Sequence, residues 1–220
     1  DLGEIQTNDS QIRSSNHLTL EALFKSNGAN TIQMGVVKDD MDSITKLIET
    51  ALLTSNIVVT TGGVSVGDYD FVQDVIKDKL KAEVLFHGVN LKPGMHILLA
   101  LKDNKIIVAL PGFAYSSTVC AMLYVLPLIY KFRNSNEKLP LVKARINQDF
   151  SRFQAKTIFT ACNVEYKNGE YQINFDGKKS GTSAILTNML ESPALLIQKE
   201  NSENIKAGDL VDILLLNNLK

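Results

Sequence analysis

Residues 56–70 read NIVVTTGGVSVGDYD, a strand pattern followed directly by a glycine loop. The β-branched run 56–61 is typical of a strand that is buried on both faces, as in a parallel sheet. Gly62, Gly63 and Gly67 then allow a backbone tight enough to present several amide N–H groups. Because a helical pattern follows the loop, its amino end also favours an anion. The sequence therefore predicts an oxyanion site here, although a sharp structural turn explains the glycines equally well.

Strand and helix patterns alternate over the first 130 residues. Such alternation with short loops predicts an α/β fold with a doubly wound, mostly parallel sheet. In sheets of this kind, ligands bind beyond the carboxyl ends of the strands. The hydroxyl groups of Thr60, Thr61 and Ser65 fall at such an end and add donors for an anion. The helix patterns cover 16–28, 42–52, 70–80 and 114–132, and the strand patterns cover 31–37, 56–60, 82–89, 96–101 and 105–110.

The pattern changes after a polar linker at 133–140. Short strand patterns follow, and Asn168-Gly169 between two of them is a strong hairpin signal. We therefore expect two domains, an α/β domain over residues 1–135 and a small all-β barrel over 141–220. The strand patterns of the second part are 142–146, 156–166, 171–175, 195–199 and 210–216.

Composition excludes several classes of protein. The 220 residues include 23 basic and 24 acidic side chains, no Trp and 7% aromatic residues, so neither a basic face nor a base-stacking module for nucleic acid is expected. The most apolar stretch, 118–130, is shorter than the roughly 20 residues that span a bilayer and predicts a core helix without membrane contact. No leader is recognised, so a cytoplasmic location is expected by default. Cys120 and Cys162 have no metal-site spacing and are expected to be small buried apolar residues.

Acidic residues flank the glycine loop. Asp39 and Asp40 follow one strand pattern, and Asp68 and Asp70 close the loop. Carboxylates beside an oxyanion repel it unless a hard cation lies between them, and Mg²⁺ bound by one or two carboxylates and a substrate phosphate is the usual arrangement. The alternative is that Asp40, Asp42 and Asp70 are helix N-caps.

Two further loops follow strand patterns. In Lys92-Pro-Gly94 and in Leu110-Pro111-Gly112, proline and glycine produce a rigid bend. Lys92 can bind a phosphate as a point charge, and the second loop precedes the amino end of the apolar helix.

Together these loops resemble the molybdopterin molybdenumtransferases, the MoeA and gephyrin E-domain family of molybdenum cofactor biosynthesis. The resemblance is carried by the helix start Ser14-Ser-Asn16 and by the segments 35–40, 60–70, 92–94 and 110–112, in the order and at the separations of the family. It extends over the first domain, and the last 80 residues resemble the small β-barrel that ends these proteins. The sheet domain and the barrel are the last two of four domains in the family, so the chain is similar to its carboxyl-terminal half, resembling a MogA-like molybdopterin-binding domain followed by the barrel.

The resemblance implies an enzyme that transfers molybdate to adenylated molybdopterin, with release of AMP and with Mg²⁺ as cofactor. It also implies a homodimer, because the family's active site lies between the sheet domain of one protomer and the amino-terminal half of the other. The residues at matching positions are Asp39 and Asp70 for catalysis and metal binding, and Thr61, Gly62, Gly63, Ser65, Gly67, Lys92, Pro111 and Gly112 for the ligand.

The chain departs from the family pattern at several ligand positions. Phe113-Ala114 replaces an Asn-Pro pair, and Met95-His96 replaces Lys-Pro. Basic residues at the first barrel hairpin are reduced to Lys156. A non-catalytic ligand-binding or scaffold module of the same fold is therefore an alternative. A molybdopterin adenylyltransferase is another, which the Val-Ser-Val-Gly loop and the extra β domain disfavour.

Overall fold

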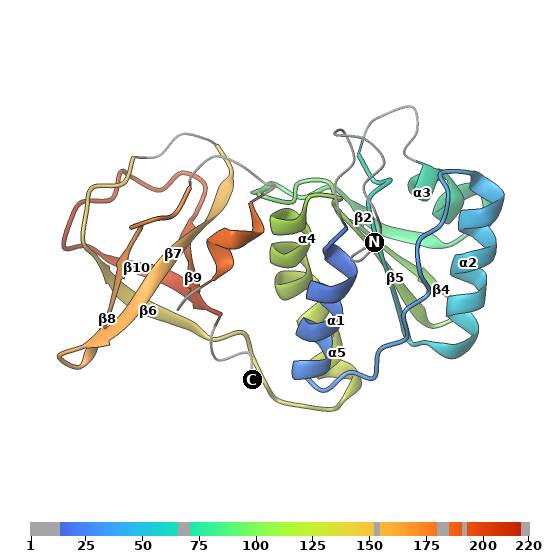
Figure 1. Ribbon diagram of the computed structural model, residues 1–220. Coiled ribbons are helices and arrows are strands. Elements are labelled where there is room, and N and C mark those ends of the chain that lie inside the picture. The colour runs from blue at the N-terminus through green and yellow to red at the C-terminus, as the bar shows by residue number, and fades with distance from the viewer. Residues whose placement is uncertain (1–13, 66–70, 152–154, 180–184, 191–192, 217–220) are drawn as a thin grey trace, which may run out of the picture.

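The computed structural model describes residues 14–65, 71–151, 155–179, 185–190 and 193–216. Its strands form two sheets, and the long helix 114–132 lies between them together with α1 (Asn16–Ser26) (Figure 1). One hydrophobic cluster contains residues of that helix, of the first sheet and of the second. The two parts of the chain therefore share buried apolar surface instead of meeting through a linker alone.

The first sheet has four strands in the order β1-β5-β4-β2. They are β1 (Ile57–Thr61), β5 (Lys105–Leu110), β4 (Leu98–Lys102) and β2 (Glu83–His87). Among the described residues β1 pairs in parallel with β5, whereas β4–β5 and β2–β4 are antiparallel. The expectation of a mostly parallel sheet was therefore wrong for this part of the chain. Asp103 and Asn104, both at positive φ, form a two-residue turn between β4 and β5. Such a short turn can only join antiparallel neighbours, because parallel pairing needs a long crossover.

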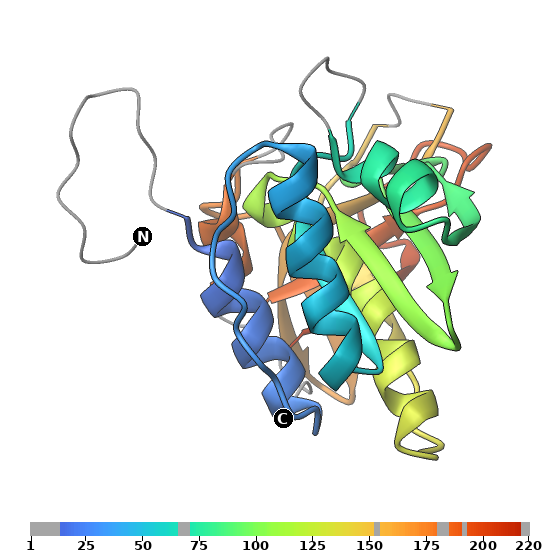
Figure 2. The ribbon, with the colours of Figure 1, turned by 90° about the vertical axis from the view of Figure 1, so that its right-hand side faces the viewer.

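Helices cover both faces of this sheet (Figure 2). Ile107 and Ala109 of β5 pack on the side of α2 (Met41–Thr54) and of α3 (Phe71–Asp74), which continues as a π-helical turn over Val75–Lys79. Val108 and Leu110 pack on the side of α1 and the long helix. This arrangement explains why the central strands read as uninterrupted apolar runs. The expected strand at 31–37 is not formed: it lies in neither sheet, and strand pairing requires a neighbour that the described residues do not supply there.

The long helix comprises α4 (Ala114–Cys120), a π-helical turn η2 (Ala121–Val125) and α5 (Leu126–Phe132). Its 19 residues are long and apolar enough to cross a membrane by length and composition, but 67% of its most apolar window is buried inside the protein. The helix is therefore the core element that its sequence predicts. Pro127 is the second residue after the π-helical turn, as expected for a residue that lacks an N–H and clashes with the preceding turn.

The second sheet closes into a barrel of five strands, because β9 pairs with both β10 and β7. Asn168-Gly169 forms the β7–β8 turn, which confirms the predicted hairpin. A short strand from the first part, β3 (Leu91–Lys92), pairs in parallel with β7. The barrel strands are β6 (Leu141–Ile146), β7 (Thr157–Lys167), β8 (Glu170–Asn174), β9 (Pro193–Gln198) and β10 (Leu210–Leu215), and η3 (Leu186–Met189) is a 3₁₀ turn before β9.

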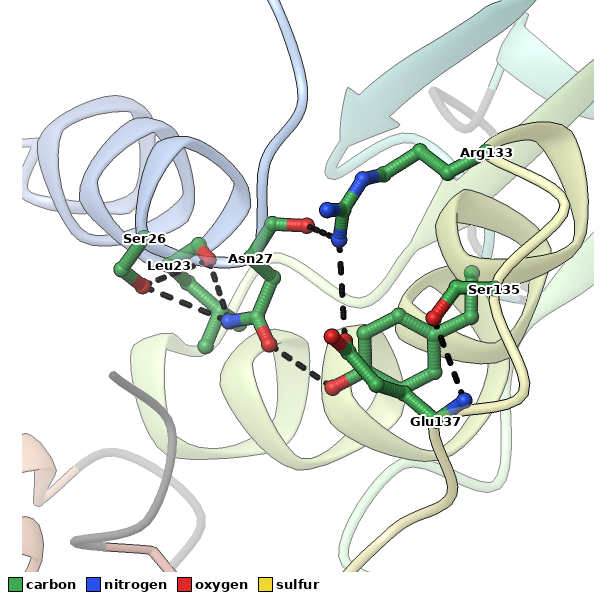
Figure 3. A network of polar contacts seen from close by, with 7 residues as sticks. Leu23, Ser26, Asn27, Arg133, Ser135 and Glu137 are labelled. Atoms are coloured by element: carbon green, nitrogen blue, oxygen red, sulfur yellow. Dashed lines mark hydrogen bonds and ion pairs between the residues drawn. The ribbon is translucent and has the colours of Figure 1, made fainter.

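Polar contacts fix the end of α1 to the end of α5 (Figure 3). Tyr130 Oη donates to Asn27 Oδ1 at 2.7 Å, and Arg133 Nη1 donates to the Asn27 carbonyl at 2.9 Å. Arg133 also lies 3.6 Å from Glu137. The predicted linker therefore starts from an anchored position. The domain limits 1–135 and 141–220 stay predictions.

Candidate functional site

The loops after β1 and β5 meet because these two strands are parallel neighbours. The Gly62 N–H donates to the Leu110 carbonyl at 3.0 Å. A Cβ added at Gly112 would lie 3.5 Å from Gly62 Cα. The structure therefore brings the predicted residues Thr61, Gly62 and Gly112 together at one edge of the sheet.

Gly63 is required by close packing. Its φ is +68°, and an added Cβ would lie 2.6 Å from Val72 Cγ2. Its carbonyl accepts the Val72 N–H at 3.2 Å, which fixes the start of α3. Ser65 is exposed. Gly67 and Asp70 lie outside the described residues, so an amide cradle from Gly62 to Gly67 stays a prediction.

Thr60 Oγ1, at the end of β1, is buried and has no hydrogen-bond partner among the described residues. A buried hydroxyl without a partner is costly. The carboxyl edge of β1 therefore retains hydrogen-bonding capacity beside the glycine loop.

The acidic residues before α2 have different roles. Asp40 is the N-cap of α2: its carboxylate accepts the Ser43 N–H at 2.8 Å, and this bond lowers the pKa of Asp40. The cap interpretation is thus confirmed for Asp40. Asp42 lies in the first turn, 3.5 Å from Lys79. Asp39 is exposed and has no polar partner among the described residues.

Whether this region can bind Mg²⁺ depends on which side chains are available as metal ligands. No group of three metal-ligating side chains occurs among the residues that the structure describes. Mg²⁺ needs only one or two carboxylates when phosphate and water complete its shell. The unpaired Asp39 carboxylate fits that role, whereas the contribution predicted for Asp70 lies outside the described residues.

A hollow of about 310 Å³ opens where the first part meets the barrel. It contains two of the predicted ligand residues, Lys92 and Pro111, both of which are half-buried. It also contains Lys156, which lies just before β7 and next to β3 in the fold. Its lining residues are Leu91, Lys92, Pro93, Gly94, Met95, His96, Pro111, Phe113, Ser116 and Lys156.

The wall formed by the Lys92–His96 segment rests on the core helix. Gly94 has φ +101°, and an added Cβ would lie 2.1 Å from Cys120 Sγ. The Cys120 thiol donates to the Gly94 carbonyl at 3.4 Å. Burial raises the pKa of Cys120 to about 12, so this thiol stays protonated at neutral pH. Cys120 and Cys162 are both buried, as predicted.

The positive charge of the hollow comes from two separate segments. Lys92 belongs to β3, and Lys156 Nζ lies 2.8 Å from Met95 Sδ on the same wall. Two cations at a half-enclosed surface favour an anionic ligand. From the sequence, Lys156 was interpreted only as the remaining basic residue of the first barrel hairpin. The pairing of β3 with β7 places it beside Lys92 in the structure.

The sequence missed the structural role of Asn16. Its Nδ2 donates to the Gly112 carbonyl at 2.8 Å, across 96 positions of the chain. From the sequence, Asn16 was interpreted as a helix start that matches the family, without a contact to the loop 111–113. Apart from Asp39, which lies just before α2, the predicted site residues that the structure describes are therefore divided between the β1–β5 edge and the hollow. The loop 111–113 joins the two places, and Asn16 fixes its middle carbonyl.

Comparisons with known proteins agree with this architecture. The model of the family described as "Probable molybdopterin binding domain" matches residues 4–131. Relatives named molybdopterin molybdenumtransferase, from Staphylococcus aureus and Staphylococcus epidermidis, are 31% identical over 94% and 93% of the chain. The chain covers 49% and 48% of these relatives, so it spans about half of their length.

Solved structures show the same fold. The molybdopterin biosynthesis moeA protein from Pyrococcus horikoshii has a TM-score of 0.70 and 25% identity, over 94% of this chain and 47% of that one. A second structure of a Pyrococcus moeA protein has a TM-score of 0.78 and 24% identity, over 100% of this chain and 51% of that one. Because the family model matches more than half of its residues, the chain belongs to the molybdopterin binding domain family of molybdenum cofactor biosynthesis.

Proposed function

We propose that this chain carries part of an active site that transfers molybdate to adenylated molybdopterin, with release of AMP. The observation that supports the proposal most strongly is the hollow in which Lys92, Lys156 and Pro111 meet. The hollow adjoins the amino end of a 19-residue helix, which favours negative charge. Molybdate and phosphate groups are both oxyanions of the kind that such a surface binds.

Each residue has a physical role in this reaction. Lys92 and Lys156 bind the anionic oxygens and offset the charge that develops when the phosphate bond breaks. Pro111 and Gly112 give the loop between hollow and sheet edge a rigid form, and Thr61, Gly62, Gly63 and Ser65 supply polar groups at that edge.

Mg²⁺ is part of the proposal, with Asp39 as a ligand and Asp70 as the second expected carboxylate. When bound, Mg²⁺ would neutralise phosphate charge and polarise the bond to be broken. We also propose a homodimer in the cytoplasm, with the rest of the site supplied by the partner subunit.

The test is calorimetric titration of the full chain with molybdate and with AMP, each with and without Mg²⁺. Lys92→Ala should weaken binding of both anions about tenfold or more, the value of a charge-assisted hydrogen bond. Lys77→Ala is the matched control, because Lys77 is an exposed lysine outside the hollow. Asp39→Asn should remove the part of AMP binding that depends on Mg²⁺.

A longer form of the protein tests the chemistry. Incubated with adenylated molybdopterin, molybdate and Mg²⁺, it should release AMP, and Asp39→Asn should slow the release. Equal affinities in Lys92→Ala and Lys77→Ala would refute the proposed anion site.

A binding module without catalysis is the second candidate. Met95, His96 and Phe113 all line the hollow at positions where the family pattern has other residues. Tight binding of adenylated molybdopterin by the longer form, with no AMP released, would favour this candidate.

A further inference from the structure

The mouth of the hollow carries two exposed apolar side chains. Phe113 is 62% exposed and Met95 is 37% exposed, although both line the hollow. Single exposed apolar residues are common on protein surfaces, but two that share the mouth of one charged hollow call for an explanation. We call Phe113 and Met95 the apolar rim.

Backbone hydrogen bonds fix the positions of the two residues of the apolar rim. The Phe113 carbonyl accepts the Ser117 N–H at 2.8 Å, and the preceding carbonyl of Gly112 accepts Asn16 at 2.8 Å. The Met95 carbonyl accepts the Val89 N–H at 2.9 Å. Both side chains therefore project from fixed positions, which reduces the entropy lost when a ligand covers them.

The size of the hollow limits what it encloses. Its volume of about 310 Å³ lies at the lower end of the range for small-molecule sites, roughly 300–1,000 Å³. An oxyanion between Lys92 and Lys156 occupies part of this space. A larger group attached to that oxyanion then has to extend over the mouth, where the apolar rim lies.

We propose that the apolar rim packs against the planar heterocycle of a ring-bearing phosphate, while Lys92 and Lys156 bind its phosphate. This inference rests on the proposed function, whose ligand carries such rings, and it assigns the residues that contact the ring. An aromatic side chain can stack on any planar heterocycle, because every such ring has a π-face. A methionine thioether makes favourable contacts with ring edges. Phe113 is then a specificity-determining residue that distinguishes a nucleotide or a pterin phosphate from a bare oxyanion.

The experiment compares three probes on the full chain by calorimetry: AMP, a pterin monophosphate and ribose 5-phosphate. At least one of the two ring-bearing probes should bind about tenfold more tightly than ribose 5-phosphate, the effect of a typical base–aromatic stack. Phe113→Ala should remove this advantage and leave the affinity for ribose 5-phosphate unchanged, whereas Phe113→Tyr should retain it. The probe that binds more tightly, AMP or the pterin monophosphate, shows which heterocycle the apolar rim contacts.

Phe132→Ala is the matched control, because Phe132 is a 45% exposed phenylalanine at the other end of the same helix. It should leave all three affinities unchanged. Thermal unfolding of each variant checks that the fold is intact.

Several results would overturn the inference. Equal affinity of the wild-type chain for ring-bearing probes and ribose 5-phosphate refutes the stacking but leaves the anion site in place. An equal loss of all affinities in Phe113→Ala shows that Phe113 only supports the loop. A shift in oligomeric state in Phe113→Ala, with unchanged affinities, assigns the ring to a contact between subunits. Failure of every probe to bind refutes the proposed function as well.

Discussion

Two loops at the site each contain a glycine that lies close to the side chain of another element, but the two loops pack against different helices. Gly63 in the loop after β1 faces Val72 of the short helix α3, at 2.6 Å from an added Cβ. Gly94 in the wall of the hollow faces Cys120 of the long core helix, at 2.1 Å. Cys120 is fully buried in the main hydrophobic cluster, so it has little freedom to move.

The difference extends to the chemistry that each loop offers. The described part of the loop after β1 supplies backbone amides and hydroxyl groups, and residues 60–65 include no cation. The hollow supplies the ammonium groups of Lys92 and Lys156. We infer that the hollow binds the charged part of a ligand through its lysine side chains. The β1–β5 edge contacts a ligand through backbone groups, so a shift of that loop would not move the lysines.

Gly94→Ala should destabilise the protein more than any other single substitution considered for these loops. Its Cβ would lie 2.1 Å from Cys120 Sγ, so the buried thiol has to shift within the packed core, and the φ of +101° adds backbone strain. We expect a loss of about 3 kcal/mol in the free energy of unfolding, together with weaker anion binding in the hollow. Urea unfolding and calorimetry with molybdate measure the two effects.

Three further variants separate the contact with Cys120 from the backbone strain. Gly63→Ala should cost less, because the Val72 side chain can shift. Gly35→Ala should cost least, because its φ is +83° but nothing lies within 4 Å of an added Cβ. Adding Cys120→Ala to Gly94→Ala should restore part of the stability by removing the opposing sulfur. Equal losses for Gly94→Ala and Gly35→Ala would show that the contact with Cys120 is unimportant.

A smaller effect is expected at alkaline pH. Burial raises the pKa of Cys120 and of Cys162 to about 12, well above the roughly 8.5 of an exposed thiol. Between these values the folded state keeps a proton that the unfolded state loses, so the free energy of unfolding falls as pH rises. Each thiol contributes at most about 1.4 kcal/mol per pH unit.

Urea unfolding between pH 8 and 9 measures this slope below the ordinary tyrosine pKa of about 10. Cys162→Ala is the informative variant, since Cys162 lies inside the barrel and away from the hollow. It should give a shallower slope than the wild type, with Cys120 accounting for the rest. An unchanged slope in Cys162→Ala would mean that the folded state does not retain this proton.

Local chemistry made much of the fold predictable. The β-branched run before Gly62 forms β1, the Asn168-Gly169 turn joins β7 and β8, and the apolar run 114–132 forms the core helix. Sheet pairing was less predictable. The two-residue turn at 103–104 makes β4 and β5 antiparallel in a sheet that was expected to be mostly parallel.

The site was predictable where a motif follows a strand. Lys92 and Pro111 were each identified from such a motif, and both line the hollow. The positions of Lys156 and Asn16 depend on contacts across 61 and 96 residues, to Met95 and Gly112 respectively. A local pattern cannot reveal such contacts, because they are set by the docking of the barrel and of α1 on the sheet.

The smallest predicted effect tests the junction between the two loops. Asn16 Nδ2 donates to the Gly112 carbonyl at 2.8 Å, so Asn16 positions the segment that joins the hollow to the β1–β5 edge. Asn16→Ala should lower the free energy of unfolding by about 1 kcal/mol and weaken AMP binding a few-fold. Asn16→Asp has the same shape but no donor, and its carboxylate repels the carbonyl, so it should weaken binding at least as much.

Gln33→Ala provides the control for Asn16, because Gln33 Nε2 donates to the His17 carbonyl of the same helix at 3.0 Å, away from the hollow. It removes a bond of the same kind, together with the bond from Gln33 Nε2 to Glu21 Oε2 at 3.2 Å, and should lower stability by a similar or slightly larger amount without changing AMP affinity. This separates positioning from stability: if Asn16→Ala and Gln33→Ala weaken AMP binding equally, α1 acts only as a structural support and the two loops are coupled by other contacts.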